Sequence, residues 1–282
     1  MKSHEPRACV IGHPIAHSRS PMIHGYWLKS LGLSGHYGRE DVTPAEFPAF
    51  IRSLRNKGYV GCNVTLPHKE AAFQLLERPT ARAEHLQVAN TLWYEGDVLC
   101  GDNTDIEGFL ANLDDRAVGW SRNLKKAVIL GAGGASASVV AALKERGAED
   151  IRIVNRTRAR AELLGERFGP TVHAAGWSEL SDALDGSDLL VNTTSLGMKG
   201  QPDLEIDLAP LPLTALVTDI VYVPLETGLL RQARLRGNPV ADGLGMLLHQ
   251  AVPGFEHWFG TRPMVTPALR ALIEADITGI TK

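Results

Sequence analysis

A glycine-rich loop joins an apolar strand to a helix in residues 126–136, KAVILGAGGAS. Gly131 permits the tight turn after the strand, and Gly133 lets the backbone approach a ligand closely. The helix behind the loop offers unpaired N–H groups and the positive end of its dipole, which together favour a phosphate. We therefore predict that the pyrophosphate of a dinucleotide binds at this loop. The predicted contacts are Gly131, Ala132, Gly133, Gly134 and Ala135.

The next strand indicates which dinucleotide binds. An NAD site usually has Asp or Glu about 20 residues beyond the glycines, where the carboxylate binds the ribose hydroxyls. Here the strand ends in NRTRAR (155–160), which has no carboxylate. Arg156 and Arg160 can pair with the 2′-phosphate of NADP, whereas Arg158 is expected to face water. The alternative is a solvated basic helix start, but cations there oppose the helix dipole, so a bound anion explains them better.

The element pattern predicts an α/β fold in two parts. Strands alternate with helices of about ten residues between positions 126 and 221, which is typical of a parallel sheet. The first hundred residues form another α/β unit with a hairpin. We predict a discontinuous α/β substrate domain, residues 1–105 completed by 242–282. A Rossmann-type dinucleotide-binding domain with a parallel sheet, residues 106–241, is expected to be inserted in it.

Individual helices are predicted from their end signals. Thr43 and Pro44 are expected to start a helix over residues 45–57, since threonine can cap a helix and proline fits its first turn. Further helices are expected over 245–259 and 267–275. These last helices are expected to fold back onto the first domain.

Composition narrows the class of protein. The chain has 282 residues, 44% hydrophobic and 22% charged, with a net charge of −3. This balance predicts a packed core and argues against a basic nucleic-acid-binding face. No long apolar stretch or signal peptide is visible, so we expect a cytoplasmic protein with no membrane partner. The three cysteines and the histidine pair His13 and His17 complete no metal-ligand set, and we expect no metal.

Four polar clusters contain candidate substrate-binding residues. They are HSRSP (17–21), NVTLPHK (63–69), Asn90-Thr91 and GDNTD (101–105). Each cluster alone could start a helix or lie in a turn. Together they supply neutral hydroxyl and amide groups with one lysine and one aspartate, a mixture that suits a small polyhydroxylated molecule.

The ordered motifs of this chain resemble those of the shikimate dehydrogenases, which reduce 3-dehydroshikimate to shikimate with NADPH in aromatic biosynthesis. The resemblance extends from Gly12 to Ala251. NVTxPxK followed by NTD is much more specific than the glycine loop. The segments are GHPIAHSRSPMIH, GCNVTLPHK, ANTLW, GDNTD, GAGGAS, NRTR and DGLGMLLHQA.

The resemblance implies a role for each matching residue. Lys69 would donate a proton to the reduced carbonyl oxygen, and Asp105 would orient it and share its protons. The substrate carboxylate would contact Ser18, Ser20 and Tyr222. The ring hydroxyls would contact Thr65, Asn90 and Gln250. Besides the glycine loop, NADP would contact Asn155, Arg156, Thr157, Arg160, Thr193, Gly243 and Met246.

Three alternatives remain open. One is a quinate/shikimate dehydrogenase of broader specificity, although serine at position 20 is typical of the shikimate type. Another is a non-catalytic NADP-binding sensor on the same fold, which the intact Lys69 and Asp105 argue against. The third is another Rossmann oxidoreductase, such as an amino-acid dehydrogenase, which the NVTLPHK segment argues against. Oligomeric state is not determined, and a homodimer is compatible with the sequence.

Overall fold

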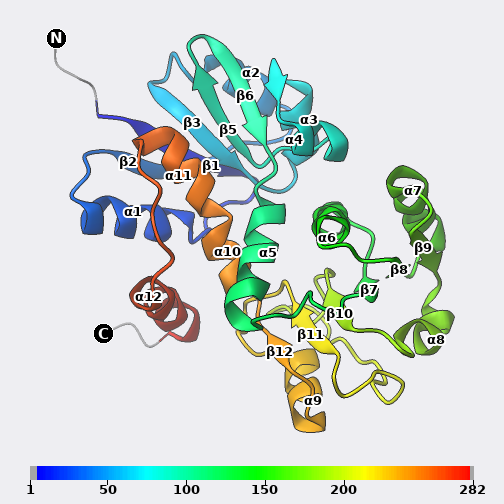
Figure 1. The fold of residues 1–282 in the computed structure, drawn as a ribbon. Helices are drawn as coiled ribbons and strands as arrows, with labels where there is room; N and C mark the ends of the chain where they lie inside the picture. Colours follow the sequence, from blue (N-terminus) through cyan, green and yellow to red (C-terminus); the bar gives the residue numbers. More distant parts are fainter. Residues whose placement is uncertain (1–4, 280–282) are drawn as a thin grey trace. The chain divides into compact units, whose positions relative to one another are not determined.

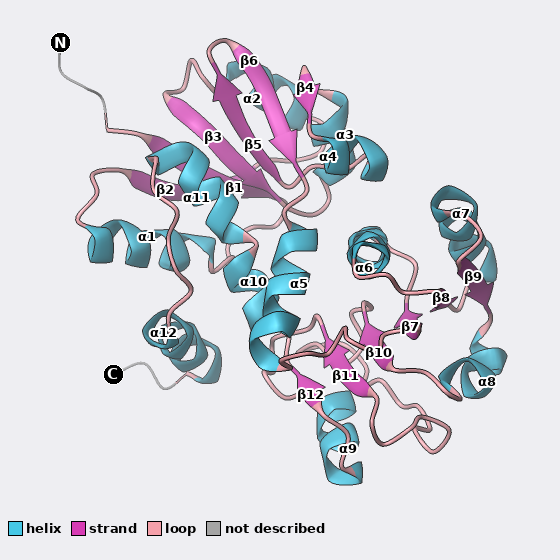
Figure 2. Cartoon of the chain, viewed as in Figure 1, coloured by secondary structure: helices cyan, strands magenta, loops and turns pink. Residues whose placement is uncertain are grey.

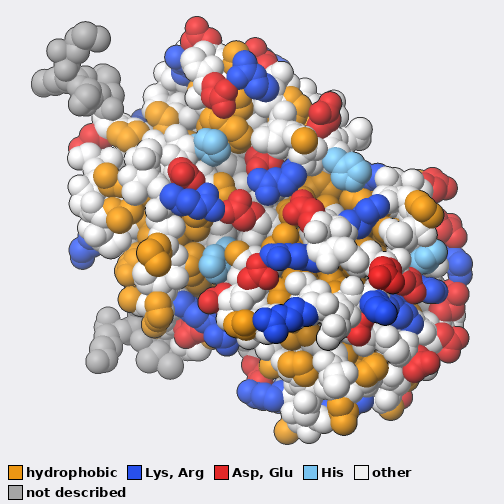
Figure 3. Space-filling model, viewed as in Figure 1, with side chains coloured by type: hydrophobic (Ala, Val, Ile, Leu, Met, Phe, Trp, Pro, Cys, Tyr) orange, Lys and Arg blue, Asp and Glu red, His pale blue; other side chains and the backbone are white. Residues whose placement is uncertain are grey.

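A computed structural model describes residues 5–279 of the chain, which form two compact units. The first unit comprises residues 5–104 and 250–273, and the second comprises 105–249 and 274–279. Within these described residues, no helix is both long and apolar enough to cross a bilayer. Positive and negative side chains are mixed over the visible surface of each unit (Figure 3).

The first unit is built on a six-stranded mixed sheet (Figure 1). The strand order is β2-β1-β3-β5-β6-β4, and β1 pairs in parallel with both β2 and β3. β5 pairs antiparallel with β3 and, through the predicted hairpin, with β6. The strands are β1 (Arg7–Gly12), β2 (His36–Asp41), β3 (Tyr59–Val64), β4 (Arg78–Pro79), β5 (Thr91–Glu95) and β6 (Val98–Asp102).

Helices cover both faces of this sheet. On one face, Trp258 of α11 packs with Tyr37 and Trp93 of the sheet, and α1 covers the same side; on the opposite face, Phe47 and Ile51 of α2 pack on the sheet next to α3. The last helix, α12, contributes residues to both units. The helices are α1 (Ser20–Leu31), α2 (Phe47–Ser53), α3 (Lys69–Gln74), α4 (Ala81–Leu86), α11 (Ala251–Phe259) and α12 (Pro267–Thr278).

Two predicted helices differ in the structure. The Thr43 hydroxyl donates to the Glu46 carboxylate at 2.6 Å and forms a turn, so α2 begins only at Phe47. The single helix predicted over 245–259 is two helices that meet at Gln250. Pro253 explains this break, because proline has no N–H and its ring clashes with the carbonyl four residues earlier.

The second unit confirms the predicted Rossmann-type parallel sheet (Figure 2). All its strand pairs are parallel, in the order β12-β11-β10-β7-β8-β9. The carboxyl ends of β7 and β10 therefore meet at one edge, next to the glycine loop. The strands are β7 (Lys126–Leu130), β8 (Asp150–Val154), β9 (Val172–Ala175), β10 (Leu189–Asn192), β11 (Leu216–Asp219) and β12 (Val240–Ala241).

Helices also flank the second sheet. α8 and α9 pack on one face, and α5, α6 and α10 lie on the other (Figure 1). The helices are α5 (Asp105–Arg116), α6 (Gly134–Glu145), α7 (Arg158–Phe168), the 3-10 helix η1 (Trp177–Glu179), α8 (Leu180–Leu184), α9 (Gly228–Arg236) and α10 (Leu244–His249).

Helix α10 groups with the second unit, which differs from the prediction that residues 242–282 complete the first domain. Its packing against α5 explains the grouping. Asn112 on α5 donates through Nδ2 to the Asp242 carbonyl at 2.7 Å. A Cβ added at Gly245 would lie 1.9 Å from Asn112 Oδ1, so glycine permits this close approach.

Candidate functional site

The glycine loop contains two kinds of glycine. Gly131 has a φ of 105°, and a Cβ added there would lie 2.9 Å from Thr193 Oγ1, so the fold itself requires glycine. Gly133 has a φ of −99°, and an added Cβ would meet no protein atom within 4 Å; the same open space surrounds Gly134. Since protein packing does not require glycine at these two positions, close approach by a ligand explains them, and the loop fits a pyrophosphate.

Side-chain hydrogen bonds hold the loop in shape. The Thr193 hydroxyl donates to the Leu130 carbonyl at 2.7 Å and lies 2.6 Å from the Ser136 hydroxyl. Ser136 in turn accepts a hydrogen bond from the Gly133 N–H at 3.1 Å. Thr193, predicted to bind the cofactor, is thus buried and hydrogen-bonded within the protein, where it supports the loop.

The three arginines after β8 have different surroundings. Arg158 forms ion pairs with Glu162 at 3.0 Å and with Glu179 at 2.7 Å. The guanidinium groups of Arg156 and Arg160 are exposed and form no hydrogen bond or ion pair within residues 5–279. These two cations therefore fit an external phosphate, while Arg158 is neutralised by its own neighbours.

The turn before α7 is shaped by the remaining predicted contacts of this segment. Asn155 donates through Nδ2 to the Thr157 carbonyl at 2.8 Å. Thr157 is the N-cap residue of α7, although its side chain makes no capping hydrogen bond.

In the first unit, Ser18 and Ser20 lie together at the start of α1. Their hydroxyl oxygens are 3.3 Å apart, and the Ser20 N–H donates to Ser18 Oγ at the same distance. Ser20 is buried at the first position of the helix, and Pro21 follows in its first turn. Two neutral hydroxyl donors are thus held side by side, an arrangement that can bind a carboxylate.

Lys69 is the first residue of α3, directly after the turn that follows β3. The preceding His68 is buried, donates from Nε2 to the Val42 carbonyl at 2.7 Å, and stacks on Phe47 at 4.4 Å. Burial lowers the pKa of His68. Its ring is engaged by Val42 and Phe47 within the protein, which fits a structural role. On the other side, the Lys69 carbonyl accepts the Ala89 N–H at 3.0 Å. Thr65, half-buried, precedes this turn and donates through its N–H to the Ile11 carbonyl at 2.9 Å.

A buried network joins Asn90 to Gln250. Asn90 Oδ1 accepts the Thr104 N–H at 2.8 Å and the Thr91 hydroxyl at 3.1 Å. The Thr104 hydroxyl donates to the Gln250 carbonyl at 2.8 Å. The orientation of the Asn90 carboxamide is therefore fixed, and the backbone of Gln250 is tied to the residue that directly precedes Asp105. Asp105 itself is buried at the start of α5.

The network also contains Asn63, Thr91 and Thr104, for which the sequence predicted no individual role. Asn63 donates to the Asn90 carbonyl at 3.2 Å and to Thr91 Oγ1 at 3.0 Å, and accepts from the Tyr37 hydroxyl at 2.6 Å. Each of the three lies inside a polar cluster quoted above, and that position was the sequence feature that could have pointed to them. Their partners depend on strand pairing, so the sequence alone did not reveal them.

The second unit brings the Tyr222 turn close to the Gly243 segment. A Cβ added at Gly243 would lie 2.5 Å from the Ile220 carbonyl oxygen, so the two backbones are in close contact. Asp219 holds the turn, because its carboxylate accepts the Val221 N–H at 2.9 Å and the Thr227 hydroxyl at 2.8 Å. Burial raises the pKa of Asp219 to about 6, and these hydrogen bonds oppose the shift. Met246 lies half-buried on the adjoining helix α10.

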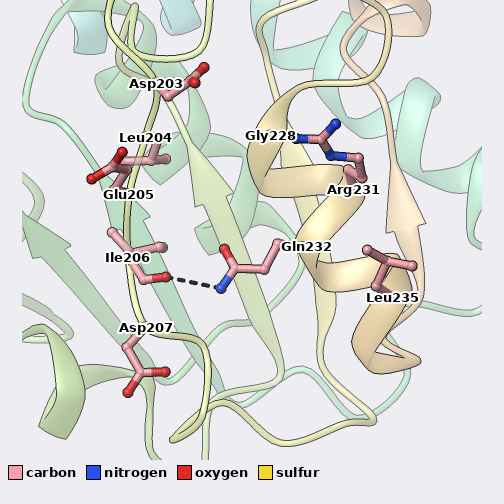
Figure 4. Close-up of a pocket in the computed structure, with 9 residues that line it drawn as sticks. All are labelled: Asp203, Leu204, Glu205, Ile206, Asp207, Gly228, Arg231, Gln232 and Leu235. Atoms are coloured by element: carbon pink, nitrogen blue, oxygen red, sulfur yellow. Dashed lines mark hydrogen bonds between the residues drawn. The ribbon is translucent and has the colours of Figure 1, made fainter.

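A pocket of about 700 Å³ lies elsewhere on the second unit (Figure 4). It runs between the extended segment 203–207 and α9, where Gln232 donates to the Ile206 carbonyl at 3.1 Å. None of the predicted site residues lines it. Within residues 5–279, no group of three His, Cys, Asp or Glu side chains is placed to hold a metal ion.

Three family models match the chain. The shikimate dehydrogenase substrate-binding domain matches residues 10–92, the shikimate/quinate 5-dehydrogenase model matches 114–198, and the shikimate 5′-dehydrogenase C-terminal domain matches 243–273.

Similar proteins match over nearly the full length. A curated shikimate dehydrogenase (NADP(+)) of Rhodopseudomonas palustris is 57% identical over 98% of this chain and 99% of its own, and one of Rhizobium etli is 56% identical over 96% of both. A solved shikimate 5-dehydrogenase of Thermus thermophilus, in complex with NADP(H) and shikimate, has a TM-score of 0.85 and 34% identity over 96% of this chain and 99% of its own. A quinate dehydrogenase of Corynebacterium glutamicum in complex with NAD has a TM-score of 0.87 and 28% identity over 95% and 98%.

Proposed function

Because this chain belongs to the shikimate dehydrogenase family, we propose that it catalyses the reversible, NADPH-dependent reduction of 3-dehydroshikimate to shikimate in aromatic amino-acid biosynthesis. The proposal rests above all on the full-length similarity to curated NADP-dependent shikimate dehydrogenases. The uncommitted guanidinium groups of Arg156 and Arg160 support NADP as the cofactor.

The proposed chemistry divides between cofactor and protein. Bound NADPH supplies a hydride to the C3 carbonyl carbon of the substrate. Lys69 donates a proton to the carbonyl oxygen, which becomes the new hydroxyl group, and Asp105 is the second member of the catalytic pair. In the reverse direction Lys69 receives that proton.

Substrate binding is assigned to the polar groups of the site. Ser18, Ser20 and Tyr222 bind the carboxylate through their hydroxyl groups, and Thr65, Asn90 and Gln250 bind the ring hydroxyls. The hydrogen bonds that orient the Asn90 carboxamide support its assignment, because a site built on fixed polar groups discriminates between hydroxyl arrangements.

The cofactor is assigned to the second unit. The glycine loop binds the pyrophosphate, Asn155, Arg156, Thr157 and Arg160 bind the adenosine phosphate, and Gly243 and Met246 lie beside the nicotinamide. Thr193 contributes by supporting the loop. We propose residues 1–105, completed by 242–282, as the substrate domain and residues 106–241 as the NADP-binding domain, with Gly243 and Met246 of the returning segment contributing to the cofactor site.

One assay tests the proposed function. NADP⁺ reduction is measured with shikimate, with quinate and with other hydroxy acids. We expect kcat/KM for shikimate to exceed that for quinate by at least about tenfold. Comparable values would indicate a broader quinate/shikimate dehydrogenase, and NADP binding without turnover of any substrate would indicate a sensor.

We further propose a cytoplasmic enzyme, and a homodimer is the compatible assembly to be tested. Light scattering of the purified protein at several concentrations tests the assembly, and a mass of one chain throughout would contradict it.

A further inference from the structure

The edge strand β2 fastens the loop that carries Ser18 and Ser20. Alternate residues of a strand share one face, and three such residues of β2 contact this loop or the helix α1 that follows it. Tyr37 stacks on His24 of α1 with the ring centroids 3.8 Å apart, Arg39 donates to the Ser18 carbonyl, and Asp41 lies 2.7 Å from His13 Nδ1. The loop is thus attached to this strand at its start and near its end, and the helix after it is attached to the same strand.

Arg39 is the cation among these three contacts. Its Nε donates to the Ser18 carbonyl at 2.9 Å, and its Nη2 donates to the same oxygen. The guanidinium makes no ion pair within residues 5–279. The nearest carboxylates along β2 are engaged elsewhere, because Glu40 accepts from the Tyr59 hydroxyl and Asp41 pairs with His13. The positive charge of Arg39 is therefore not neutralised by any described neighbour.

The residues assigned to the substrate carboxylate are all neutral. Ser18, Ser20 and Tyr222 offer hydroxyl groups, which bind an anion but do not balance its charge. A guanidinium bonded to the backbone of Ser18 places a full positive charge within one residue of the serine hydroxyls. Charge-assisted hydrogen bonds are also stronger than neutral ones, so Arg39 restrains the Ser18 backbone more strongly than a neutral donor would.

We propose that Arg39 is a positioning residue for the substrate carboxylate, which holds Ser18 in place and supplies the positive potential that the ring carboxylate requires. This inference rests on the proposed function, because it takes Ser18 and Ser20 as the carboxylate site. Arg39 acts through Ser18 and the local field, so it affects substrate binding more than hydride transfer.

The design of the test follows from the other two anchors. Replacing Arg39 leaves the Asp41 contact with His13 and the stacking of Tyr37 on His24 of α1 in place, so Arg39→Gln is expected to fold. Arg55 provides a matched control in the same unit. It pairs with exposed Asp97 at 2.6 Å and donates to the Gly96 carbonyl at 2.7 Å, at the turn between β5 and β6. Arg55→Gln removes the same charge from a turn outside the loop.

Steady-state kinetics with shikimate and NADP⁺ give the expected pattern. Arg39→Gln raises KM for shikimate about three- to fivefold, the size of one exposed charged contact, with kcat within about twofold and KM for NADP⁺ unchanged. Arg39→Lys keeps the charge but loses the two-pronged guanidinium contact, so its KM for shikimate should lie between those of wild type and Arg39→Gln. Arg55→Gln behaves as wild type.

Two further readouts separate the electrostatic role from a structural one. Added salt raises KM for shikimate in wild type, and this dependence is weaker in Arg39→Gln because the screened charge is absent. The methyl ester of shikimate has no anionic carboxylate, so wild type and Arg39→Gln should differ less with the ester than with shikimate.

Defined results overturn the inference. A KM for shikimate within twofold of wild type in Arg39→Gln removes Arg39 from carboxylate binding. An equal loss with shikimate and its methyl ester, or a fall in kcat with a lowered melting temperature, shows a structural role only. Wild-type enzyme that neither binds nor oxidises shikimate refutes the proposed function itself, and the assignment of Arg39 falls with it.

Discussion

Cofactor choice can be tested by reversing one charge after β8. The perturbation is Arg156→Asp, with Arg158→Gln as the control. Arg156 and Arg160 are exposed and have no partner for their guanidinium groups within residues 5–279, whereas Arg158 already pairs with Glu162 and Glu179. If the first two bind the 2′-phosphate and the third does not, only the first substitution should change the preference for NADP.

The size of the preference for NADP over NAD follows from the two arginines that have no ion-pair partner in the described chain. A hydrogen bond to a charged group contributes about 1.5–3 kcal/mol, and exposure to solvent reduces this towards about 1 kcal/mol. Two exposed arginines should therefore favour NADP over NAD by about 2–3 kcal/mol, or about 30- to 150-fold. Arg156→Asp removes one contact and adds a carboxylate that repels the phosphate and can bind the ribose hydroxyls. We expect kcat/KM for NADP⁺ to decrease strongly and kcat/KM for NAD⁺ to stay unchanged or increase.

Two measurements check this prediction. The first is kcat/KM for each cofactor at saturating shikimate. The second is the dissociation constant of NADPH and NADH from nucleotide fluorescence, which needs no turnover. Salt should weaken NADPH binding more than NADH binding, and Arg158→Gln should change the preference by less than about threefold. Equal use of both cofactors by wild type, or equal effects of the two substitutions, would refute the reasoning.

Three other predictions concern catalysis and stability. Lys69→Ala should lower kcat by about 10²- to 10⁴-fold with a smaller change in KM. In the double variant with Asp105→Asn, the loss in log kcat should be smaller than the sum of the two single losses. A Lys69→Ala variant that keeps more than half of the wild-type kcat would exclude Lys69 from the mechanism. His24 is fully buried without a hydrogen-bond partner in the described chain, and burial lowers its pKa from 6.5 to about 3. Below pH 6.5 the unfolded state therefore binds a proton that the folded state does not bind, and the free energy of unfolding should fall by about 2 kcal/mol between about pH 7.5 and 5. Urea titrations at several pH values measure this fall. If His24→Phe showed the same fall between these pH values as wild type, the assignment to His24 would be wrong. Gly245→Ala should cost about 1–3 kcal/mol by thermal unfolding because its Cβ has no room, whereas Gly25→Ala, in open space on α1, should be stabilising; equal melting temperatures would argue against the close packing of α10.

Features encoded by consecutive residues could be predicted from the sequence. The glycine loop, the basic segment after β8 and the NVTLPHK segment each combine residue types at short spacing. The apolar runs around them predicted both α/β units and the parallel sheet of the second. These signals are local, because a turn conformation, a helix start or a buried strand depends mainly on a few neighbouring residues.

Only the tertiary structure decided which polar residues act together. The segment HYGRED (36–41) buries a single large side chain, Tyr37, so its pattern did not indicate the edge strand that anchors Ser18. Arg158 differs from Arg156 because Glu179, 21 residues away, pairs with it. Thr104 meets Asn90 because β5 and β6 pair in a register that sequence periodicity does not specify. The sequence by itself determined the kind of chemistry present in each segment. The orientation of Asn90 and the charge left on Arg39 and Arg156 depended on contacts between distant residues, which form only when strands and helices pack together.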